Sequence, residues 1–446
     1  MVGQRTGRAR PRASRWLDGL GVRPGATVPA LVATNPHSVA LVLAGAATGR
    51  PIAPLGVRLT EHELSQTLQR IASDVVVAAT EFAEIGARIA ERAGKRLEVF
   101  DAFAADPDRI AQRTHPDSIA ALVHTSGTTG LPKPVPYRNK PLLRRVAVNS
   151  TLMGLGPGCA YATASPFHHI AGLGNVFVAM GSGATLVSMP KFSAGEWQHL
   201  DDLGVTHAFV AATMIGMLMS EDKLRLKNLR LLQYGASTIR PETLRAAMEQ
   251  LPGVDFINFF GQTEGSPITV LTPDDHRRAV QDRPDLLESV GRPPEGVEIT
   301  IHDPDHHGVG EVWARAEHMF RTEDDGWLHT GDMGRLDDEG YLFLTGRKGD
   351  LIIRGGENVY PIEVEGVLIR HPAVREVAVV GRPDERVGET VKAYIVPLDP
   401  ASPPDPEELR RFTREQLAGF KVPTDWELTT ALPRDTSGKL LRRRLV

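Results

Sequence analysis

From Val28 onward, short apolar runs alternate with longer segments in which apolar and polar residues are mixed. Three of these runs predict buried strands, at residues 29–33, 51–54 and 74–79. The segment 38–47 predicts a small apolar helix, and Thr60 with Glu63 has the pattern of a capping box that begins another helix. Strands that alternate with helices predict parallel sheets covered by helices on both faces.

The C-terminal part of the chain predicts a small α+β domain. Apolar runs at 374–380 and 390–396 predict two strands. A proline-rich linker at 400–406 follows them, and 407–417 predicts a helix. The expected fold class is therefore α/β, with a large N-terminal domain of layered parallel sheets and a small α+β C-terminal domain.

The composition is that of an ordinary globular enzyme. With 446 residues the chain is long enough for two or three domains, and its net charge of −4 gives no indication of binding to nucleic acid or to an anionic membrane. Cys159 is the only cysteine, which excludes an intrachain disulfide and is typical of a reducing cytoplasm. No apolar run reaches membrane-spanning length, and the arginine-rich N-terminus lacks the apolar core of a secretory signal. We expect a cytoplasmic protein, monomeric or homodimeric, with no integral membrane segment.

The most informative stretch runs from His124 to Lys133 and reads HTSGTTGLPK. An apolar run at 118–123 precedes it and predicts a short buried strand. Glycines let backbone N–H groups turn toward phosphate oxygens, Ser and Thr hydroxyls donate to those oxygens, and a lysine adds positive charge. The spacing is not that of a Walker loop, and no G-x-G-x-x-G follows a strand, so a dinucleotide-binding fold is not indicated. The stretch predicts a polyphosphate-binding loop, although by itself it is also compatible with a Gly/Thr-rich surface turn.

This loop resembles the phosphate loop of the adenylate-forming superfamily, which includes acyl-CoA synthetases, peptide-synthetase adenylation domains and beetle luciferases. Further segments are similar to that family's motifs and follow in the family's order, at 54–60, 165–172, 231–238, 258–265, 327–332, 346–350, 355–365 and 432–440. The resemblance covers residues 28–445 and is nearest to acyl-CoA synthetases. It implies an N-terminal domain of 1–348 that includes a small antiparallel, barrel-like subdomain, and a mobile C-terminal domain of 349–446 that rotates about a hinge at Gly349.

The resemblance implies an acid–thiol ligase that uses ATP and Mg²⁺ to convert a carboxylic acid to acyl-AMP with release of pyrophosphate. The acyl group then passes to a thiol, and the segment 355–365 favours coenzyme A, as in the acyl-CoA synthetases of fatty acid metabolism. Two alternatives stay open. One is an acyl-AMP ligase that loads a carrier-protein phosphopantetheine or another nucleophile, and the other is a non-catalytic acyl-adenylate-binding protein.

The resemblance also assigns roles to individual residues. Those implied to bind ATP are Thr125, Ser126, Gly127, Thr128, Thr129, Gly130, Lys133, Gly235, Ala236, Ser237, Asn258, Phe259, Phe260, Gly261, Thr263, Asp332, Arg347 and Lys439. Those implied to be catalytic are His169, Thr263, Glu264 and Lys439, and Glu264 is also a hard oxygen ligand suited to Mg²⁺. Those implied to line the acyl pocket are His169, Met214, Met217, Tyr234 and Phe259, and those implied to border the thiol tunnel are Gly355 and Gly356.

The chain departs from the family pattern in several places. It begins late, so the first subdomain is expected to be abbreviated. After Lys133 the sequence 134–136, Pro-Val-Pro, replaces the usual Gly-Val, so a stiffer loop is expected. Gly349 replaces the Asp or Lys usual at the hinge, and glycine accepts large changes in φ and ψ. Three site residues have alternative roles: His169 as a packed histidine, Asp332 as an exposed turn residue and Lys439 as part of a solvated basic tail.

Overall fold

The computed structural model describes residues 12–57, 59–103, 114–125, 133–235, 239–434 and 440–445. The chain divides into two compact units. Unit 1 comprises Met1–Glu298 and Arg315–Leu328, and unit 2 comprises Ile299–Ala314 and His329–Val446. The expected domain boundary at 348/349, with its hinge at Gly349, stays a prediction.

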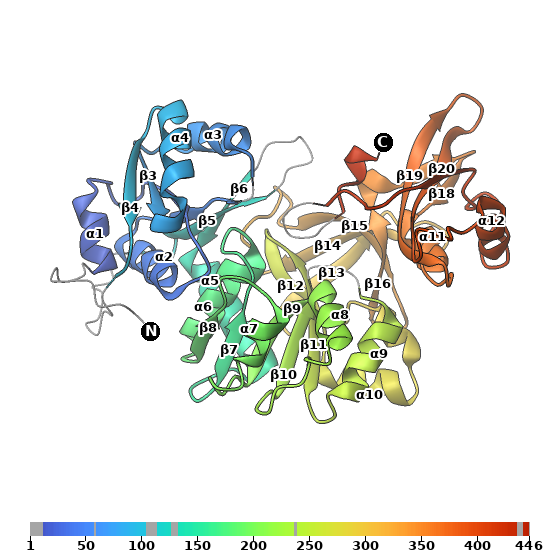
Figure 1. Ribbon diagram of the computed structural model, residues 1–446, viewed down its shortest axis with the longest axis horizontal. Helices are drawn as coiled ribbons and strands as arrows, with labels where there is room; N and C mark the ends of the chain where they lie inside the picture. Colours follow the sequence, from blue (N-terminus) through green and yellow to red (C-terminus); the bar gives the residue numbers. More distant parts are fainter. Residues whose placement is uncertain are drawn as a thin grey trace. The chain divides into compact units, whose positions relative to one another are not determined.

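The first sheet of unit 1 has six strands in the order β4-β3-β1-β2-β5-β6. Figure 1 labels β3, β4, β5 and β6 of this sheet. Their bounds are β1 Val28–Leu31, β2 Ile52–Pro54, β3 Val75–Ala79, β4 Arg96–Phe100, β5 Ile119–Thr125 and β6 Lys133–Arg138. All neighbouring pairs are parallel except β5 with β6. The helices α3 and α4 pack on one face and α1 and α2 on the other, with bounds α1 Ala13–Gly19, α2 Pro36–Thr48, α3 Glu61–Arg70 and α4 Ala83–Ala93. The predicted capping box is confirmed, because Thr60 accepts from the Glu63 N–H and Glu63 accepts from the Thr60 N–H.

The second sheet of unit 1 has six strands in the order β12-β11-β10-β9-β7-β8. Their bounds are β7 Ala160–Thr163, β8 Thr185–Ser188, β9 His207–Ala211, β10 Leu231–Gly235, β11 Asp255–Gln262 and β12 Gly265–Leu271. Only the edge strand β12 is antiparallel to its neighbour. The remaining helical elements of unit 1 are α5 Asn139–Met153, α6 Ile170–Gly181, α7 Ala194–Gln198, α8 Ala212–Ser220, α9 Pro241–Gln250, α10 Pro273–Gln281, η1 Thr80–Phe82 and η2 Pro284–Glu288.

Helices α5 and α6 lie between the two sheets and contribute to the core of both. Leu142 of α5 and Leu173 of α6 belong to the apolar cluster of the first sheet, whereas Met153 and Val178 belong to that of the second. This sharing explains why the sequence of α6 is apolar nearly all round, with little polar surface to face water.

Unit 2 is built on two smaller sheets. One is a four-stranded sheet in the order β13-β14-β15-β16, most of which belongs to unit 2. Its strands are β13 Val297–His302, β14 Gly310–Ala316, β15 Leu328–Leu336 and β16 Leu342–Arg347. The other sheet has the order β18-β17-β20-β19 with β21 beside β20, and bounds β17 Ile352–Arg354, β18 Glu357–Val359, β19 Val374–Asp384, β20 Gly388–Pro397 and β21 Asp425–Leu428. Its helical elements are α11 Pro361–Leu368, α12 Pro406–Arg414, η3 Lys348–Asp350 and η4 Arg442–Arg444, and α11 and α12 contribute to the same apolar core as β19 and β20.

The expected fold class is confirmed, and one local expectation is wrong. The segment 134–136 is not a stiff loop but the middle of strand β6, where Pro134 pairs with His124 and Pro136 with Leu122. Strand β6 is the edge of its sheet, and proline is tolerated there because a missing N–H can face away from the neighbouring strand. Among the described residues, no helix is both long and apolar enough to cross a membrane.

A buried histidine on the outer face of the second sheet predicts a pH-dependent stability. Tyr234 Oη lies 2.9 Å from His276 Nε2, and His276 Nδ1 lies 2.7 Å from the Thr272 carbonyl, so the neutral ring donates from Nδ1 and accepts at Nε2. Burial lowers the pKa of His276 from 6.5 to about 4, against the opposing effect of the Thr272 carbonyl. The unfolded state therefore binds more protons than the folded state between these values, and the free energy of unfolding falls as pH drops from about 6.5 toward 4, by up to roughly 3 kcal/mol from this group.

We expect His276→Gln to flatten this dependence. Urea unfolding of both proteins at pH 7.5 and at pH 5 measures it, and other titrating groups cancel in the comparison. Identical pH dependence in the two proteins would contradict the assignment.

Candidate active site

The predicted acyl and adenine residues of unit 1 lie along the carboxyl ends of the parallel strands of the second sheet. His169 follows β7, Met214 follows β9, Gly235 ends β10, and Thr263 and Glu264 follow β11. The order of strands reverses between β7 and β9, because the chain runs from β7 to β8 on one side and then to β9 on the other. Such a reversal opens a crevice at the carboxyl edge of a sheet, where α/β proteins bind ligands.

The carboxyl ends of the first sheet meet this edge. Thr34, just beyond β1, donates its hydroxyl to the Ser165 carbonyl at 3.4 Å. A Cβ at Gly56, just beyond β2, would lie 3.3 Å from Cδ2 of His168. Strand β5 ends at Thr125, immediately before the expected phosphate loop. Both sheets of unit 1 therefore present their carboxyl ends to the same region.

His169 occupies the N-cap position of α6, and its half-buried ring lies 4.2 Å from that of His168, centroid to centroid. Gly172 allows this arrangement, because a Cβ there would lie 2.1 Å from the Pro166 carbonyl oxygen. The glycine of the P-x-x-H-x-x-G pattern thus lets the first turn of α6 pack directly on the backbone that precedes it. The structure fixes the place of His169; its catalytic role stays a prediction.

The Asn258–Glu264 segment forms the end of β11 and the turn into β12. Asn258 Nδ2 donates to the Tyr234 carbonyl at 3.2 Å, which ties β11 to β10. A register shift between Phe260 and Gln262 bends the strand at this point, as bulges beside active sites do. A Cβ at Gly261 would lie 2.7 Å from Ser266 Cβ, so only glycine lets the hairpin close as tightly as it does.

The turn that carries Thr263 and Glu264 is held from outside through its backbone carbonyls. Among the described residues the donors are Tyr137 Oη to Thr263 O at 3.2 Å, the Phe320 and Arg321 N–H groups to Glu264 O at 2.7 and 3.4 Å, Arg145 Nε to Ser266 O at 3.1 Å and His318 Nε2 to Pro267 O at 2.8 Å. Tyr137 also stacks on Phe320, with ring centroids 3.9 Å apart. The sequence alone does not reveal these donors, since they contact backbone rather than a motif side chain and no local pattern marks them.

The Glu264 side chain is half-buried, and within the described part of the chain its carboxylate makes no hydrogen bond or ion pair. The described residues contain no cluster of three or more metal-ligating side chains. Mg²⁺ typically takes one or two protein carboxylates and completes its octahedron with waters and substrate phosphates. A single uncommitted carboxylate on a fixed turn therefore fits Mg²⁺ that is bound together with a nucleotide, and does not fit a metal held by protein alone.

In unit 2, Asp332 and Arg347 face each other across β15 and β16. Arg347 Nε lies 2.6 Å from Asp332 Oδ1, and Arg347 also donates to the Thr330 carbonyl at 3.1 Å. The Asp332 N–H donates to Thr330 Oγ1 at 3.0 Å, and the Gly331 N–H donates to Glu311 at 3.0 Å. Asp332 is only 6% exposed, so the alternative of an exposed turn residue is wrong. The predicted ribose pair is brought together, and its role toward ribose stays a prediction.

The glycines of the predicted thiol tunnel form a tight hairpin. Gly355 and Gly356 have φ of 62° and 85° and join β17 to β18, with Arg354 paired to Glu357. A two-residue turn with positive φ at both positions needs residues such as glycine for its own geometry. The glycines are thus explained by the hairpin, and the tunnel remains a prediction.

The structure separates the predicted acyl-pocket residues. Met214 lies at the start of α8, where its sulfur lies 3.4 Å from the Ala211 N–H. Met217, one turn further along α8, is 45% exposed. Tyr234 is buried on the α10 side of the sheet, where its hydroxyl pairs with His276. Met214 and His169 flank the strand reversal. Tyr234 and Met217 face elsewhere, so the assignment of Tyr234 and Met217 to the acyl pocket rests on the resemblance alone.

Several predicted residues lie outside the described part of the chain, namely Ser126, Gly127, Thr128, Thr129, Gly130, Ala236, Ser237 and Lys439. Lys133 begins β6 and is exposed. Their roles stay predictions.

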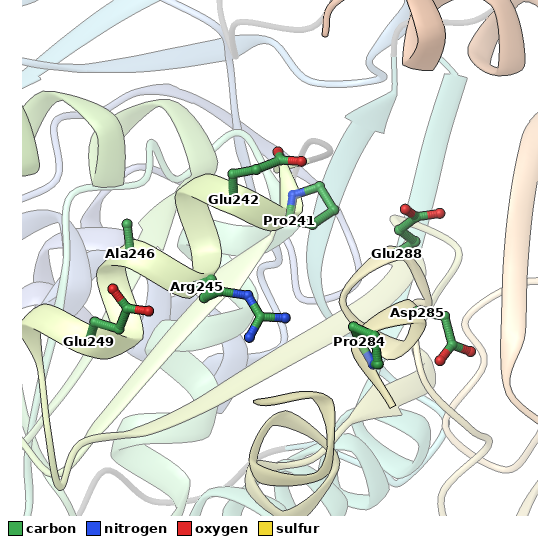
Figure 2. A pocket seen from close by; sticks show the side chains of 8 residues that line it. All are labelled: Pro241, Glu242, Arg245, Ala246, Glu249, Pro284, Asp285 and Glu288. Atoms are coloured by element: carbon green, nitrogen blue, oxygen red, sulfur yellow. The ribbon is translucent and has the colours of Figure 1, made fainter. Parts of the chain in front are cut away.

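A separate hollow of about 470 Å³ lies between α9 and η2, and Figure 2 shows the side chains of these two elements on its opposite sides. It is lined by Pro241, Glu242, Arg245, Ala246, Glu249, Pro284, Asp285 and Glu288. Of the predicted site residues that the structure describes, none borders it. Its four carboxylates against one guanidinium would repel both a carboxylate substrate and a polyphosphate, so we do not assign the active site to it.

Comparison with known proteins finds two matching family models. The family model described as "AMP-binding enzyme" matches residues 7–322, and the one described as "AMP-binding enzyme C-terminal domain" matches residues 363–439. The fatty acid–[acyl-carrier-protein] ligase ScoC of Streptomyces coeruleorubidus is 33% identical over 97% of this chain and 89% of that protein.

Two solved structures show the same similarity. The amide bond synthetase McbA from Marinactinospora thermotolerans matches with a TM-score of 0.85 and 30% identity, over 97% of this chain and 92% of that one. The O-succinylbenzoate coenzyme A synthetase MenE from Bacillus subtilis, in complex with ATP and magnesium ion, matches with a TM-score of 0.84 and 29% identity, over 97% and 92% of the two chains.

Proposed function

Because the chain belongs to the AMP-binding enzymes, we propose that it activates a carboxylic acid with ATP to acyl-AMP and then transfers the acyl group to a thiol. The observation that carries the proposal is the turn after β11. It holds Glu264 at the carboxyl edge of the second sheet, the edge on which the strand reversal also opens, with its carboxylate uncommitted among the described residues.

In the first step an oxygen of the acid attacks the α-phosphorus of ATP in line. A new P–O bond joins acid and AMP, and the bond to the β-phosphate breaks to release pyrophosphate. Glu264 would hold Mg²⁺, whose charge neutralises phosphate oxygens, and Asp332 with Arg347 would orient the ribose. Positioning and charge stabilisation of this kind supply most of the rate acceleration in phosphoryl chemistry.

We propose coenzyme A as the acceptor, with a carrier-protein phosphopantetheine as the alternative. The similar proteins include both kinds, since ScoC is named for an acyl-carrier protein and MenE for coenzyme A. In either case a thiol sulfur attacks the acyl carbon, and AMP leaves with its phosphate oxygen. A cytoplasmic location and a monomeric or homodimeric state belong to the same proposal.

Exchange of labelled pyrophosphate into ATP, measured across a panel of carboxylic acids, tests the first step. We expect exchange to depend on one class of acid and on Mg²⁺. Absence of exchange with every acid, alongside tight binding of an acyl-adenylate analogue, would indicate the non-catalytic alternative. Thioester formation with coenzyme A and with a loaded carrier protein then separates the acceptors.

A substitution at Gly349 tests the proposed hinge. Gly349 lies within η3, and a Cβ there would meet nothing within 4 Å. Gly349→Pro fixes φ and restricts the residue before it, so we expect thioester formation to slow about tenfold or more while adenylation is retained. Gly349→Ala, which fits without a clash, is the matched control and should stay near wild type. Equal loss of both steps in Gly349→Pro would instead make Gly349 a structural residue.

A further inference from the structure

Arg145 is a buried arginine for which the described residues supply no carboxylate partner. It lies on α5 and is 3% exposed, and its Nε donates to the Ser266 carbonyl at 3.1 Å. No carboxylate within the described ranges makes an ion pair with its guanidinium, and its NH1 group finds no hydrogen-bond partner there. The adjacent Arg144 is its opposite, since it is exposed and pairs with Glu317 at 2.5 Å.

An uncompensated buried charge costs free energy. Burial lowers the pKa of Arg145, although an arginine remains protonated at any ordinary pH. Replacing even a paired buried charge by an apolar side chain of similar volume is often neutral or stabilising. Stability of the fold therefore does not explain an arginine at this position.

The surroundings of Arg145 are shaped to accept it. A Cβ at Gly174 of α6 would lie 2.6 Å from its NH1 and 2.9 Å from its Cζ, so the absence of a side chain at Gly174 makes the room for the guanidinium. Within the described ranges, the hydrogen bond that its guanidinium makes is to Ser266 O, two residues after Glu264. On the other side of Glu264, the Tyr137 hydroxyl donates to Thr263 O, and burial raises the pKa of Tyr137, which keeps it a donor.

Together, Tyr137 and Arg145 hold the backbone on both sides of Glu264. The Phe320 N–H holds the Glu264 carbonyl itself at 2.7 Å, whereas the Glu264 carboxylate makes no hydrogen bond or ion pair with the described residues. A carboxylate intended for Mg²⁺ needs this precision, because Mg²⁺ demands near-ideal octahedral geometry.

We propose that Arg145 is a positioning residue, whose guanidinium fixes the Ser266 carbonyl and thereby aims the Glu264 carboxylate for Mg²⁺ bound with ATP. The inference rests on the proposed function. In this role Arg145 acts through the backbone of the turn and does not itself contact the substrate. Gly174 is its necessary partner, because any larger residue displaces the guanidinium.

Three variants test this inference. Arg145→Met removes the charge and keeps most of the volume, and Arg145→Lys restores a cation and one donor. Gly174→Ala keeps Arg145 but pushes its guanidinium away, while alanine raises the intrinsic helix propensity of α6. Arg144→Met is the matched control on the same helix, since it removes an arginine whose ion pair is exposed.

The measurements are the thermal midpoint, amide hydrogen exchange of residues 263–266, and the Mg²⁺ dependence of both ATP binding and pyrophosphate exchange. For Arg145→Met we expect an unchanged or higher midpoint, faster amide exchange in this turn, and a Mg²⁺ half-saturation raised about tenfold. We expect a pyrophosphate exchange rate lowered about tenfold to a hundredfold, as for an ångström-scale misplacement. Arg145→Lys should recover part of the loss, Gly174→Ala should resemble Arg145→Met, and Arg144→Met should match wild type.

The inference is overturned if Arg145→Met keeps the wild-type Mg²⁺ dependence and the wild-type amide protection of residues 263–266. It is also overturned if the thermal midpoint of Arg145→Met falls by many degrees while its pyrophosphate exchange rate stays normal with Mg²⁺ in excess. Failure of the proposed function has a different signature. In that case the wild type itself shows no pyrophosphate exchange with any acid, and the inference is decided by amide exchange and by Mg²⁺-dependent ATP binding alone.

Discussion

Replacement of Lys439 by alanine will slow acyl-AMP formation by about a hundredfold or more and leave acyl transfer from supplied acyl-AMP within about tenfold of wild type. The first step brings together a carboxylate and a triphosphate, both anionic, and a cation that bridges them stabilises the transition state. Each factor of ten in rate corresponds to about 1.4 kcal/mol. The second step starts from a single phosphate ester with little charge at the carbonyl, so it should need the lysine far less.

The segments on either side of residues 435–439 weaken the alternative of a solvated basic tail. Arg434 and Leu440 form an antiparallel bridge, and the Leu441 N–H donates to the Pro433 carbonyl at 2.8 Å. Arg442 lies 2.5 Å from Glu365, in a half-buried ion pair. Leu445 is buried, and its carbonyl accepts from Tyr394 Oη at 2.6 Å. The described residues that flank 435–439 are therefore held within unit 2.

Arg443→Ala is the control for Lys439→Ala, because Arg443 is an exposed cation of the same segment. It should leave both half-reactions unchanged. Measured separately, the two half-reactions decide the matter. Unchanged adenylation in Lys439→Ala removes the catalytic assignment, and equal loss in both half-reactions indicates misfolding.

The elements that could be predicted from the sequence are those that depend on neighbours in the chain. Thr60 and Glu63 form a capping box because both partners lie within one helical turn. The 374–380 and 390–396 strands were found because an apolar run of strand length is a local signal, and β19 and β20 contain them. The resemblance to a known family also predicted part of the site, since Asp332 and Arg347 are recognisable by motif and do meet across two strands.

What could not be predicted depends on contacts between distant segments. Tyr137 and Arg145 lie 126 and 121 residues from the carbonyls to which they donate, and no periodicity links such positions. The resemblance assigns Tyr234 to the acyl pocket, yet its side chain faces α10. Successive strand residues point to opposite faces, and the sequence does not show which face meets the ligand when both are buried.

The prolines at 134 and 136 also show that a local pattern cannot predict a structure that depends on distant segments. Two prolines separated by one residue suggest a loop, because proline cannot donate to a ladder. On an edge strand the same spacing is compatible with pairing, since alternate residues direct their N–H groups to the same side. Strand order, which decides whether β6 is an edge, follows from the whole fold and not from its own sequence.

Glu264→Gln will lower the rate of acyl-AMP formation by about a hundredfold to a thousandfold, comparable to the loss of one preorganised group in an electrostatic site. The substitution keeps the size of the side chain and leaves the Glu264 carbonyl bound to the Phe320 N–H, so the turn should keep its conformation. The variant loses only the negative charge. Stability should therefore stay unchanged, because the carboxylate makes no ion pair within the part of the chain described.

The Mg²⁺ dependence of Glu264→Gln distinguishes a metal ligand from a residue that shapes the site. A ligand for Mg²⁺ predicts a raised Mg²⁺ half-saturation for pyrophosphate exchange and for ATP binding, with near-normal transfer from supplied acyl-AMP, a step in which no polyphosphate takes part. Glu317→Gln is the matched control, since Glu317 is an exposed carboxylate that pairs with Arg144. If Glu264→Gln keeps adenylation within about threefold of wild type and the same Mg²⁺ requirement, the metal must be held elsewhere, and the turn after β11 loses the chemistry assigned to it.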